Sequence, residues 1–408
     1  MVLSWLQNRA KPRTPAAAAP VDSAAAPSPH AAALEALPDP FLLITREGPT
    51  SSPIRILFAN AAARGLYAVP PTGGMLASAL RRPEVLEAAE KTLESGVEQN
   101  LSYETSGSAT RYWRAFSRPL PADGTGRRLA LLMLRDETDA RRSERMRTDF
   151  LANASHELRT PLASLTGFID TLRGHAREDP VARDRFLGIM AEQADRMGRL
   201  IDDLLSLSRI ELNEHIAPVG RCDLSGAVLD VADALGVLLK AKSVSIELNL
   251  APAGKAVAAG DRDQILQVVQ NLVDNAVKYT PPGGRVRVET EGDLTPAQAQ
   301  AYDPASPRTA ANGGGRLSLL TPDHIRGERY VRLRVVDHGK GMAREHLPRL
   351  TERFYRVEGQ KSGDRFGTGL GLAIVKHIIN RHRGGLSVES APDEGAAFCA
   401  YFPMARED

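Results

Sequence analysis

A histidine followed by a glutamate, His156-Glu157, is the first place where this sequence could do chemistry. Apolar residues recur at steps of three and four from Phe150 to Leu172, which predicts an amphipathic helix. His156 falls between two of them, Ala154 and Leu158, so we expect its ring to face solvent. A neutral imidazole oriented by a carboxylate can attack phosphorus. An isolated His-Glu pair is more often an ordinary surface feature, so the neighbouring motifs must show whether this pair is catalytic.

A second polar cluster lies in QNLVDNAVKYT, residues 270–280, on a predicted helix that begins at Asp261. Asn271, Asn275 and Lys278 share one face of that helix, opposite an apolar face. Two neutral amide oxygens one turn apart suit a hard magnesium ion without repelling phosphates, and Lys278 adds a positive charge for them. Such a polar face is usually only solvated, so this cluster taken alone is weak evidence for a metal or phosphate site.

Two glycine-bearing segments follow. A predicted strand ends at Asp337 before Gly339 and Gly341, which places a carboxylate acceptor at a turn where the backbone can approach a flat ring. GTGLG, residues 367–371, opens a helix whose amides can hold phosphate, and no strand runs directly into it as a Rossmann turn would require. The polar stretch at residues 357–366 is typical of a lid that orders over a nucleotide.

In this fixed order the motifs resemble the conserved boxes of sensor histidine kinases of two-component systems, with HELRTPL, residues 156–162, as the H box. The resemblance implies that His156 is the phosphoacceptor, that Glu157 is the assisting base, and that Thr160 positions water during dephosphorylation of a response regulator. It also implies ATP and Mg²⁺ as cofactors, with Asn275 holding the metal and Asn271 assisting. The residues that it places around the nucleotide are Asn271, Asn275, Lys278, Tyr279, Asp337, Gly339, Gly341, Phe354, Arg356, Gly367, Thr368, Gly369, Leu370 and Gly371.

The elements that must position these motifs form a multidomain α+β chain of four predicted parts. Residues 1–33 are rich in Pro and Ala and are predicted to be a disordered leader. Residues 34–136 combine short β-type runs with helices and resemble a PAS sensor domain. This segment has no His or Cys for a haem ligand or a flavin adduct.

The remaining two parts carry the motifs. Residues 137–212 are predicted to form a helical hairpin that turns between Gly174 and Pro180, with a kink at Pro161. Because two helices alone bury little, we expect a four-helix bundle with a second copy, and therefore a homodimer. Residues 213–408 alternate helices and β-type runs, an α/β sandwich of the GHKL type, with a surface insertion at 291–328 inside a hairpin.

The composition limits the class of protein. The 408 residues carry 52 Lys and Arg against 50 Asp and Glu, a net charge of +2, so there is no global argument for nucleic-acid binding. Two cysteines, Cys222 and Cys399, fit a reducing compartment rather than a disulfide framework. No apolar run is long enough for a spanning helix. We expect a cytoplasmic protein, or one held peripherally at the inner membrane, with a signal that is internal or arrives through a membrane-protein partner.

Within the family, the segments DHGKGM, RFYRVE and GTGLGLAIVKHIINRHRGGLSVES are most similar to phosphate-regulon sensor kinases of the PhoR type. That similarity implies a response regulator of the PhoB type, which would take the phosphoryl group onto an aspartate. Two alternatives remain open. One is a PAS-dimer scaffold or phosphatase with a degenerate kinase, which intact His156, Asn275 and Asp337 disfavour. The other is a chaperone or DNA-repair ATPase of the GHKL type, which has no reason to carry an H box.

Overall fold

The computed structural model describes residues 29–406 except 47, 49–51, 71–72, 107–109, 123, 303–307, 309–312, 323–326 and 358–366. Most of the predicted leader and of the predicted lid therefore lies outside the described residues. The chain divides into two compact units, Met1–Thr148 and Asp149–Asp408.

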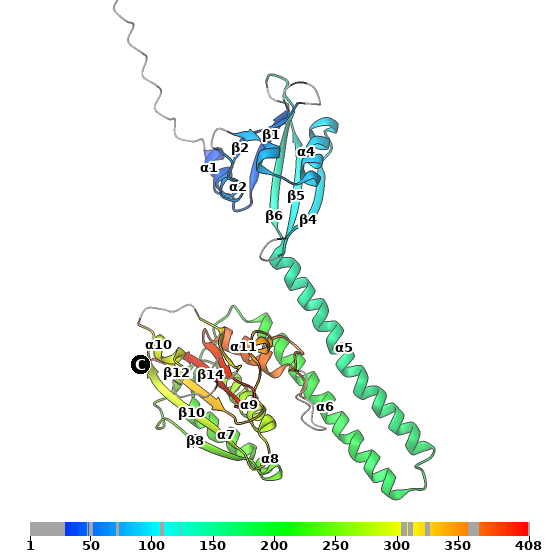
Figure 1. Ribbon diagram of the computed structural model, residues 1–408, viewed down its shortest axis with the longest axis vertical. Coiled ribbons are helices and arrows are strands. Elements are labelled where there is room, and N and C mark those ends of the chain that lie inside the picture. Colours follow the sequence, from blue (N-terminus) through cyan, green and yellow to red (C-terminus); the bar gives the residue numbers. More distant parts are fainter. Residues whose placement is uncertain are drawn as a thin grey trace, which may run out of the picture. The chain divides into compact units, whose positions relative to one another are not determined.

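The first unit is built on one antiparallel sheet in the order β3-β2-β1-β6-β5-β4 (Figure 1). Alternating residues of β1, such as Leu42 and Ile44, pack with Leu132 and Leu134 of β6 in its core. The Asn60 side chain accepts from the backbone N–H groups of Phe41 and Ala63 and so ties a helix to a strand. The elements are α1 Pro29–Glu35, β1 Phe41–Arg46, β2 Ile54–Ala59, α2 Ala61–Tyr67, β3 Gly74–Met75, α3 Leu76–Ala79, α4 Pro83–Ser95, β4 Gln99–Thr105, β5 Arg111–Leu120 and β6 Leu129–Asp136.

Two long helices, α5 (Thr138–Arg173) and α6 (Pro180–Leu212), confirm the predicted hairpin. Asp179 begins α6 by accepting from the N–H groups of Val181 and Ala182. Pro161 lies inside α5, and the helix continues through it, so the expected kink does not interrupt the element. In the C-terminal half of α6, three apolar residues are buried in the core of the second unit: Leu200, Leu207 and Ile210.

The second unit confirms the predicted sandwich. Its sheet has the order β11-β13-β14-β12-β10-β8, with β8 parallel to β10 and the other pairs antiparallel (Figure 1). Inward residues such as Val288, Leu333 and Val388 share one core with the apolar faces of α7, α9 and α11. The elements are β7 Arg221–Asp223, α7 Leu224–Ala234, α8 Gly236–Lys242, β8 Ser245–Asn249, β9 Val257–Ala259, α9 Arg262–Tyr279, β10 Arg285–Leu294, β12 Tyr330–Val336, the 3-10 helix η2 Arg344–Arg349, α11 Gly371–Arg381, β13 Gly385–Ser390 and β14 Ala396–Pro403.

The insertion at 291–328 joins β10 and β12, which pair as a hairpin as expected. Its described part is more than the surface loop that the composition suggested. It forms α10 (Pro296–Gln300), which a Thr295 capping box begins, and β11 (Gly315–Leu320), which pairs with β13 at the sheet edge. Ala299 of α10 is fully buried against Tyr330 and Tyr401. The insertion is therefore an integral part of this sheet.

Candidate functional site: an exposed histidine and a nucleotide face

His156 is exposed on α5, while Ala154 on the same helix is buried, so the predicted orientation of the ring is confirmed. Thr160 lies one turn further along, and its hydroxyl donates to the backbone carbonyl of His156 at 3.3 Å. Both side chains are therefore accessible to a reaction partner from solvent.

Glu157 is held by two arginines from distant elements. Its Oε2 accepts from Arg196 of α6 at 3.2 Å and from Arg356, in the segment before α11, at 3.1 Å. The adjacent Phe354 ring lies 6.0 Å from the ring of Phe150 on α5. The sequence placed Arg356 at the nucleotide, whereas the structure places it against the residue next to His156.

The polar face of α9 meets the glycine-rich segment that opens α11. A Cβ placed on Gly371 would lie 2.9 Å from Oδ1 of Asn271 and 4.0 Å from Nδ2 of Asn275. A Cβ on Gly367 would lie 2.5 Å from Nζ of Lys278. A side chain at either glycine would displace the end of an α9 side chain, so glycine suits the close approach of these two segments.

Lys278 and Tyr279 are the last two residues of α9. Burial lowers the pKa of Lys278, and nearby Asp274 opposes that shift. The ammonium lies 5.1 Å from the centre of the Tyr279 ring. A partly desolvated cation interacts more strongly with phosphate than one in bulk water, which suits the predicted role of Lys278.

Asp337 is 6% exposed at the end of β12. Its Oδ1 accepts from the N–H of Gly339 at 2.8 Å and of Ala396 at 3.2 Å. Burial raises the pKa of this carboxyl, and the two N–H groups and Arg308 oppose that shift. At Gly341, with φ of +59°, a Cβ would lie 1.8 Å from the carbonyl oxygen of Ala391, so only glycine fits.

The segment before α11 is fixed at both ends. Phe354 has a left-handed backbone, and its N–H donates to Gly369, which is also left-handed, at 2.9 Å. The Thr368 hydroxyl donates to Asp203 of α6 at 2.6 Å and accepts from the N–H of Leu370. Burial raises the pKa of Asp203, and the hydrogen bond from Thr368 opposes it. Thr368, predicted to face the nucleotide, is thus bound to the hairpin.

The structure therefore brings together the predicted nucleotide residues of α9, of the Asp337 turn and of the glycine segment. It also brings in three residues that sequence reasoning missed: Arg196, Asp203 and Arg308. No local pattern could have identified them, because each acts through a partner far away in the chain. In the described part of the chain, no hydrogen bond or ion pair joins the His156 ring to the nucleotide face.

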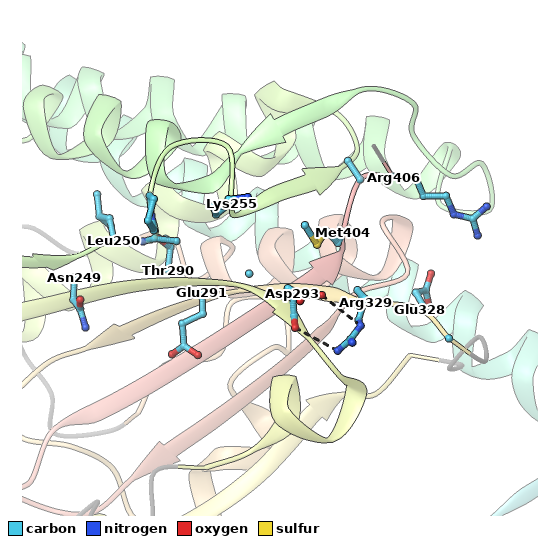
Figure 2. A pocket seen from close by; sticks show the side chains of 15 residues that line it. Asn249, Leu250, Lys255, Thr290, Glu291, Asp293, Glu328, Arg329, Met404 and Arg406 are labelled. Carbon is cyan, nitrogen blue, oxygen red and sulfur yellow. Dashed lines mark hydrogen bonds and ion pairs between the residues drawn. The ribbon is translucent and has the colours of Figure 1, made fainter. Parts of the chain in front are cut away.

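A cavity of about 970 Å³ lies elsewhere, at the beginning of β12 (Figure 2). Lys255, Asp293 and Arg329 line it, and Arg329 pairs with Asp293 at 3.4 Å. Asp337 is at the other end of the same strand, so this cavity is separate from the nucleotide face. Among the described residues, no three His, Cys, Asp or Glu side chains converge on a metal position, and none of the helices is long and apolar enough to cross a membrane.

The class of protein can now be given. Residues 260–406 match the family described as "Histidine kinase-, DNA gyrase B-, and HSP90-like ATPase". Residues 146–213, which include His156, match the "His Kinase A (phospho-acceptor) domain". An ATP-binding domain of this kind together with a phosphoacceptor hairpin defines a histidine kinase.

Similar proteins narrow the class. The phosphate regulon sensor protein PhoR of Pseudomonas aeruginosa is 36% identical over 69% of this chain and 55% of its own length. The sensor-like histidine kinase SenX3 of Mycolicibacterium smegmatis is 30% identical over 78% of this chain and 74% of its own length. The chain belongs to the sensor histidine kinases. It spans little more than half of the Pseudomonas protein.

Among solved structures, histidine kinase ThkA in complex with response regulator protein TrrA is 19% identical, with a TM-score of 0.45. The match covers 92% of this chain and 98% of that one.

Proposed function

We propose that this chain is an ATP-dependent protein histidine kinase that phosphorylates itself on His156 and passes the phosphoryl group to an aspartate of a response regulator. The proposal rests on two features that occur together in one compact unit of the chain. An exposed histidine on α5 and a glycine-fitted polar face on α9 occur in that unit, joined by the ion pair between Arg356 and Glu157.

Each part of the nucleotide face has a task in this proposal. Asp337 accepts a hydrogen bond from the amino group of adenine, and Gly339 and Gly341 let the backbone lie close to the ring. Lys278 and the amides at the start of α11 neutralise phosphate charge. Oδ1 of Asn271 and Nδ2 of Asn275 lie nearest to Gly371, and the neutral amide oxygens of these two side chains suit a hard cation. Bound Mg²⁺ would there offset the charge of the phosphates.

In the transfer step, a nitrogen of His156 forms a bond to the γ-phosphorus as the bond from that phosphorus to the β,γ-bridging oxygen breaks, and ADP leaves. The ring proton passes to Glu157. Two arginines hold the Glu157 carboxylate, and release of one of them would free it to receive the ring proton. Arg356 is suited to that change, because nucleotide phosphates offer it another anionic partner. Thr160 would position the water that hydrolyses the phosphoryl aspartate of the regulator.

The predicted homodimer has a physical basis in the hairpin. Apolar side chains of α5 and α6 remain exposed in the single chain, among them Leu162, Ile169 and Leu187. A second copy in a four-helix bundle would cover them.

The finer assignments extend the proposal. The 36% identity to a phosphate regulon sensor protein supports a phosphate-regulon role and a PhoB-type regulator. The antiparallel sheet of the first unit, with the helix that Asn60 caps, supports a PAS-like sensor module in residues 34–136. The cytoplasmic or peripheral location stays a prediction, as do the boundaries of the leader, hairpin and ATP-binding domain.

Labelling with radioactive γ-phosphate tests the proposal. The full chain incubated with labelled ATP and Mg²⁺ should give a phosphoprotein that is labile in acid and stable in alkali. His156→Gln should give no label while binding ATP normally, and Asn275→Asp should lose both label and ATP affinity. Equal labelling of His156→Gln would refute the acceptor, and normal ATP affinity of Asn275→Asp would refute the metal role.

A degenerate kinase that acts only as a phosphatase makes a different prediction. It would remove phosphate from a phosphorylated regulator without ever labelling itself. The intact contacts of Asp337 and of the glycine segment favour the kinase over this alternative.

A further inference from the structure

Described residues of the insertion, Ala299 of α10 and Arg308, contact the outer face of the second sheet, opposite its helices. Outward residues of β12 alternate with the core residues and include Tyr330, Arg332 and Arg334. Near the start of β12, Arg332 donates to the backbone carbonyls of Gln298 at 3.0 Å and Ala301 at 3.3 Å. These contacts fix the insertion at the end of the strand that is remote from the nucleotide.

Arg308 reaches the other end of β12. This residue of the insertion is 4% exposed, and its Nη2 donates to the backbone carbonyl of Asp337 at 2.8 Å. A buried guanidinium is costly unless it is hydrogen-bonded and balanced by charge. Its position therefore reflects a specific interaction with the Asp337 turn.

The charges around this pair come from several elements. Burial raises the pKa of Asp337, and the charges of Arg308 and His338 oppose that shift. Burial lowers the pKa of Arg308, and the carboxylates of Glu389 and Glu394 oppose that shift, while Arg334 adds to it. Arg334 and Glu389 pair with each other at 3.9 Å. Arg308 is thus the cation that the insertion adds beside a buried carboxylate.

We propose that Arg308 is a positioning residue of the nucleotide site, which holds the turn carrying Asp337 and keeps its carboxylate as the acceptor for the amino group of adenine. The inference rests on the proposed ATP site and gives the insertion a role in it. Arg308 acts through Asp337 and does not touch the nucleotide. Asp337 Oδ1 is already held by two N–H groups, so Arg308 supplies what they do not: a full positive charge and an anchor on the carbonyl.

The test compares Mg-ATP with the triphosphate of purine riboside, which lacks the amino group. Binding of each to the full chain is measured by isothermal titration calorimetry. The wild-type chain should prefer ATP by about tenfold, the worth of one hydrogen bond to a charged group. Arg308→Gln should reduce that preference at least about threefold, while affinity for the purine analogue changes little. A loss of structure alone would weaken both ligands equally and leave their ratio unchanged.

Controls separate the possible failures. Asp337→Asn should abolish the preference, and Arg329→Gln, the same change at the far end of β12 (Figure 2), should preserve it. If Arg308→Gln does not fold, Arg308→Lys is used, and its preference should lie below that of the wild type. An unchanged ratio in the folded Arg308 variant would overturn the inference alone. If the wild-type chain binds neither nucleotide, the proposed function fails with it.

Discussion

The helix around His156 and the nucleotide face solve opposite problems. On α5 the reactive side chain is exposed, and the apolar residues around it, such as Leu151 and Leu162, are more than half exposed. On the nucleotide face Asp337 is enclosed, and the glycines fit against α9 so closely that a single added carbon would collide. The described residues of the nucleotide face pack closely against one another, whereas the acceptor helix leaves apolar side chains exposed.

This difference indicates which of the two regions depends on contact with other protein parts. A site that must hold one small molecule gains from rigid, buried polar groups, because their geometry is fixed before binding. In the proposed function the acceptor site meets the ATP-binding domain and then a regulator, so it has to remain accessible. Substitutions in each region separately test this difference.

The largest effect is expected from a charge in the hairpin. Ile169→Glu should weaken the dimer at least about 100-fold, because burying an unpaired charge costs about 3–5 kcal/mol. ATP affinity should not change. Sedimentation equilibrium measures the dimer, and Val219→Glu, at a 91% exposed position outside the hairpin, is the matched control. A stable Ile169→Glu dimer would show that this face is not the interface.

A smaller effect is expected at the nucleotide face. Gly371→Ala should lower affinity for Mg-ATP about tenfold, since the new methyl displaces the Asn271 amide. The fold should survive, because the end of a side chain can move. Gly236→Ala, at a helical position with nothing within 4 Å, should leave affinity unchanged. Wild-type affinity in Gly371→Ala would contradict the role of Asn271.

The third effect is a pH dependence of stability from buried His382. Its Nε2 accepts from the N–H of Asp261 at 3.1 Å and its Nδ1 donates to Ile378, so the folded state holds the neutral ring. Burial lowers the pKa of His382. The unfolded state therefore binds more protons below about pH 6.5, and stability falls as the pH decreases through that value.

We expect His382 to make the unfolding free energy of the second unit lower at pH 5 than at pH 8. Urea unfolding at both pH values measures it. His382→Gln keeps an acceptor for Asp261 and should flatten this difference. An undiminished difference in that variant would assign the pH dependence to other groups.

The smallest effect concerns the link between the two regions. Glu157 and Arg356 are each about one third exposed, with side-chain values of 31% and 35%. A double-mutant cycle with Glu157→Gln and Arg356→Gln should give a coupling below about 1 kcal/mol in unfolding free energy. A much larger coupling would mean that the two regions form one rigid site and do not behave independently.

Local patterns predicted much of this molecule. Helical periodicity gave α5, α6 and α9, and alternation of apolar residues gave β10, β12 and β14. The strand β11 was missed because its sequence, GRLSLL, follows a glycine-rich stretch that reads as a loop. The contact of Glu157 with Arg356 joins residues 199 positions apart, and no local pattern encodes such a pair.

The position of α6 has a further consequence. At 1.5 Å per residue, its 33 residues extend about 50 Å, and they begin at the hairpin turn and end with Leu207 and Ile210 inside the ATPase core. The bundle and the ATP-binding domain therefore share a helix. A fragment cut at residue 213 would expose an apolar strip and lose the partner of Thr368, so a useful excised ATPase should begin upstream of Leu200. Because α6 ends inside this core, a displacement of α6 would be transmitted directly to α11.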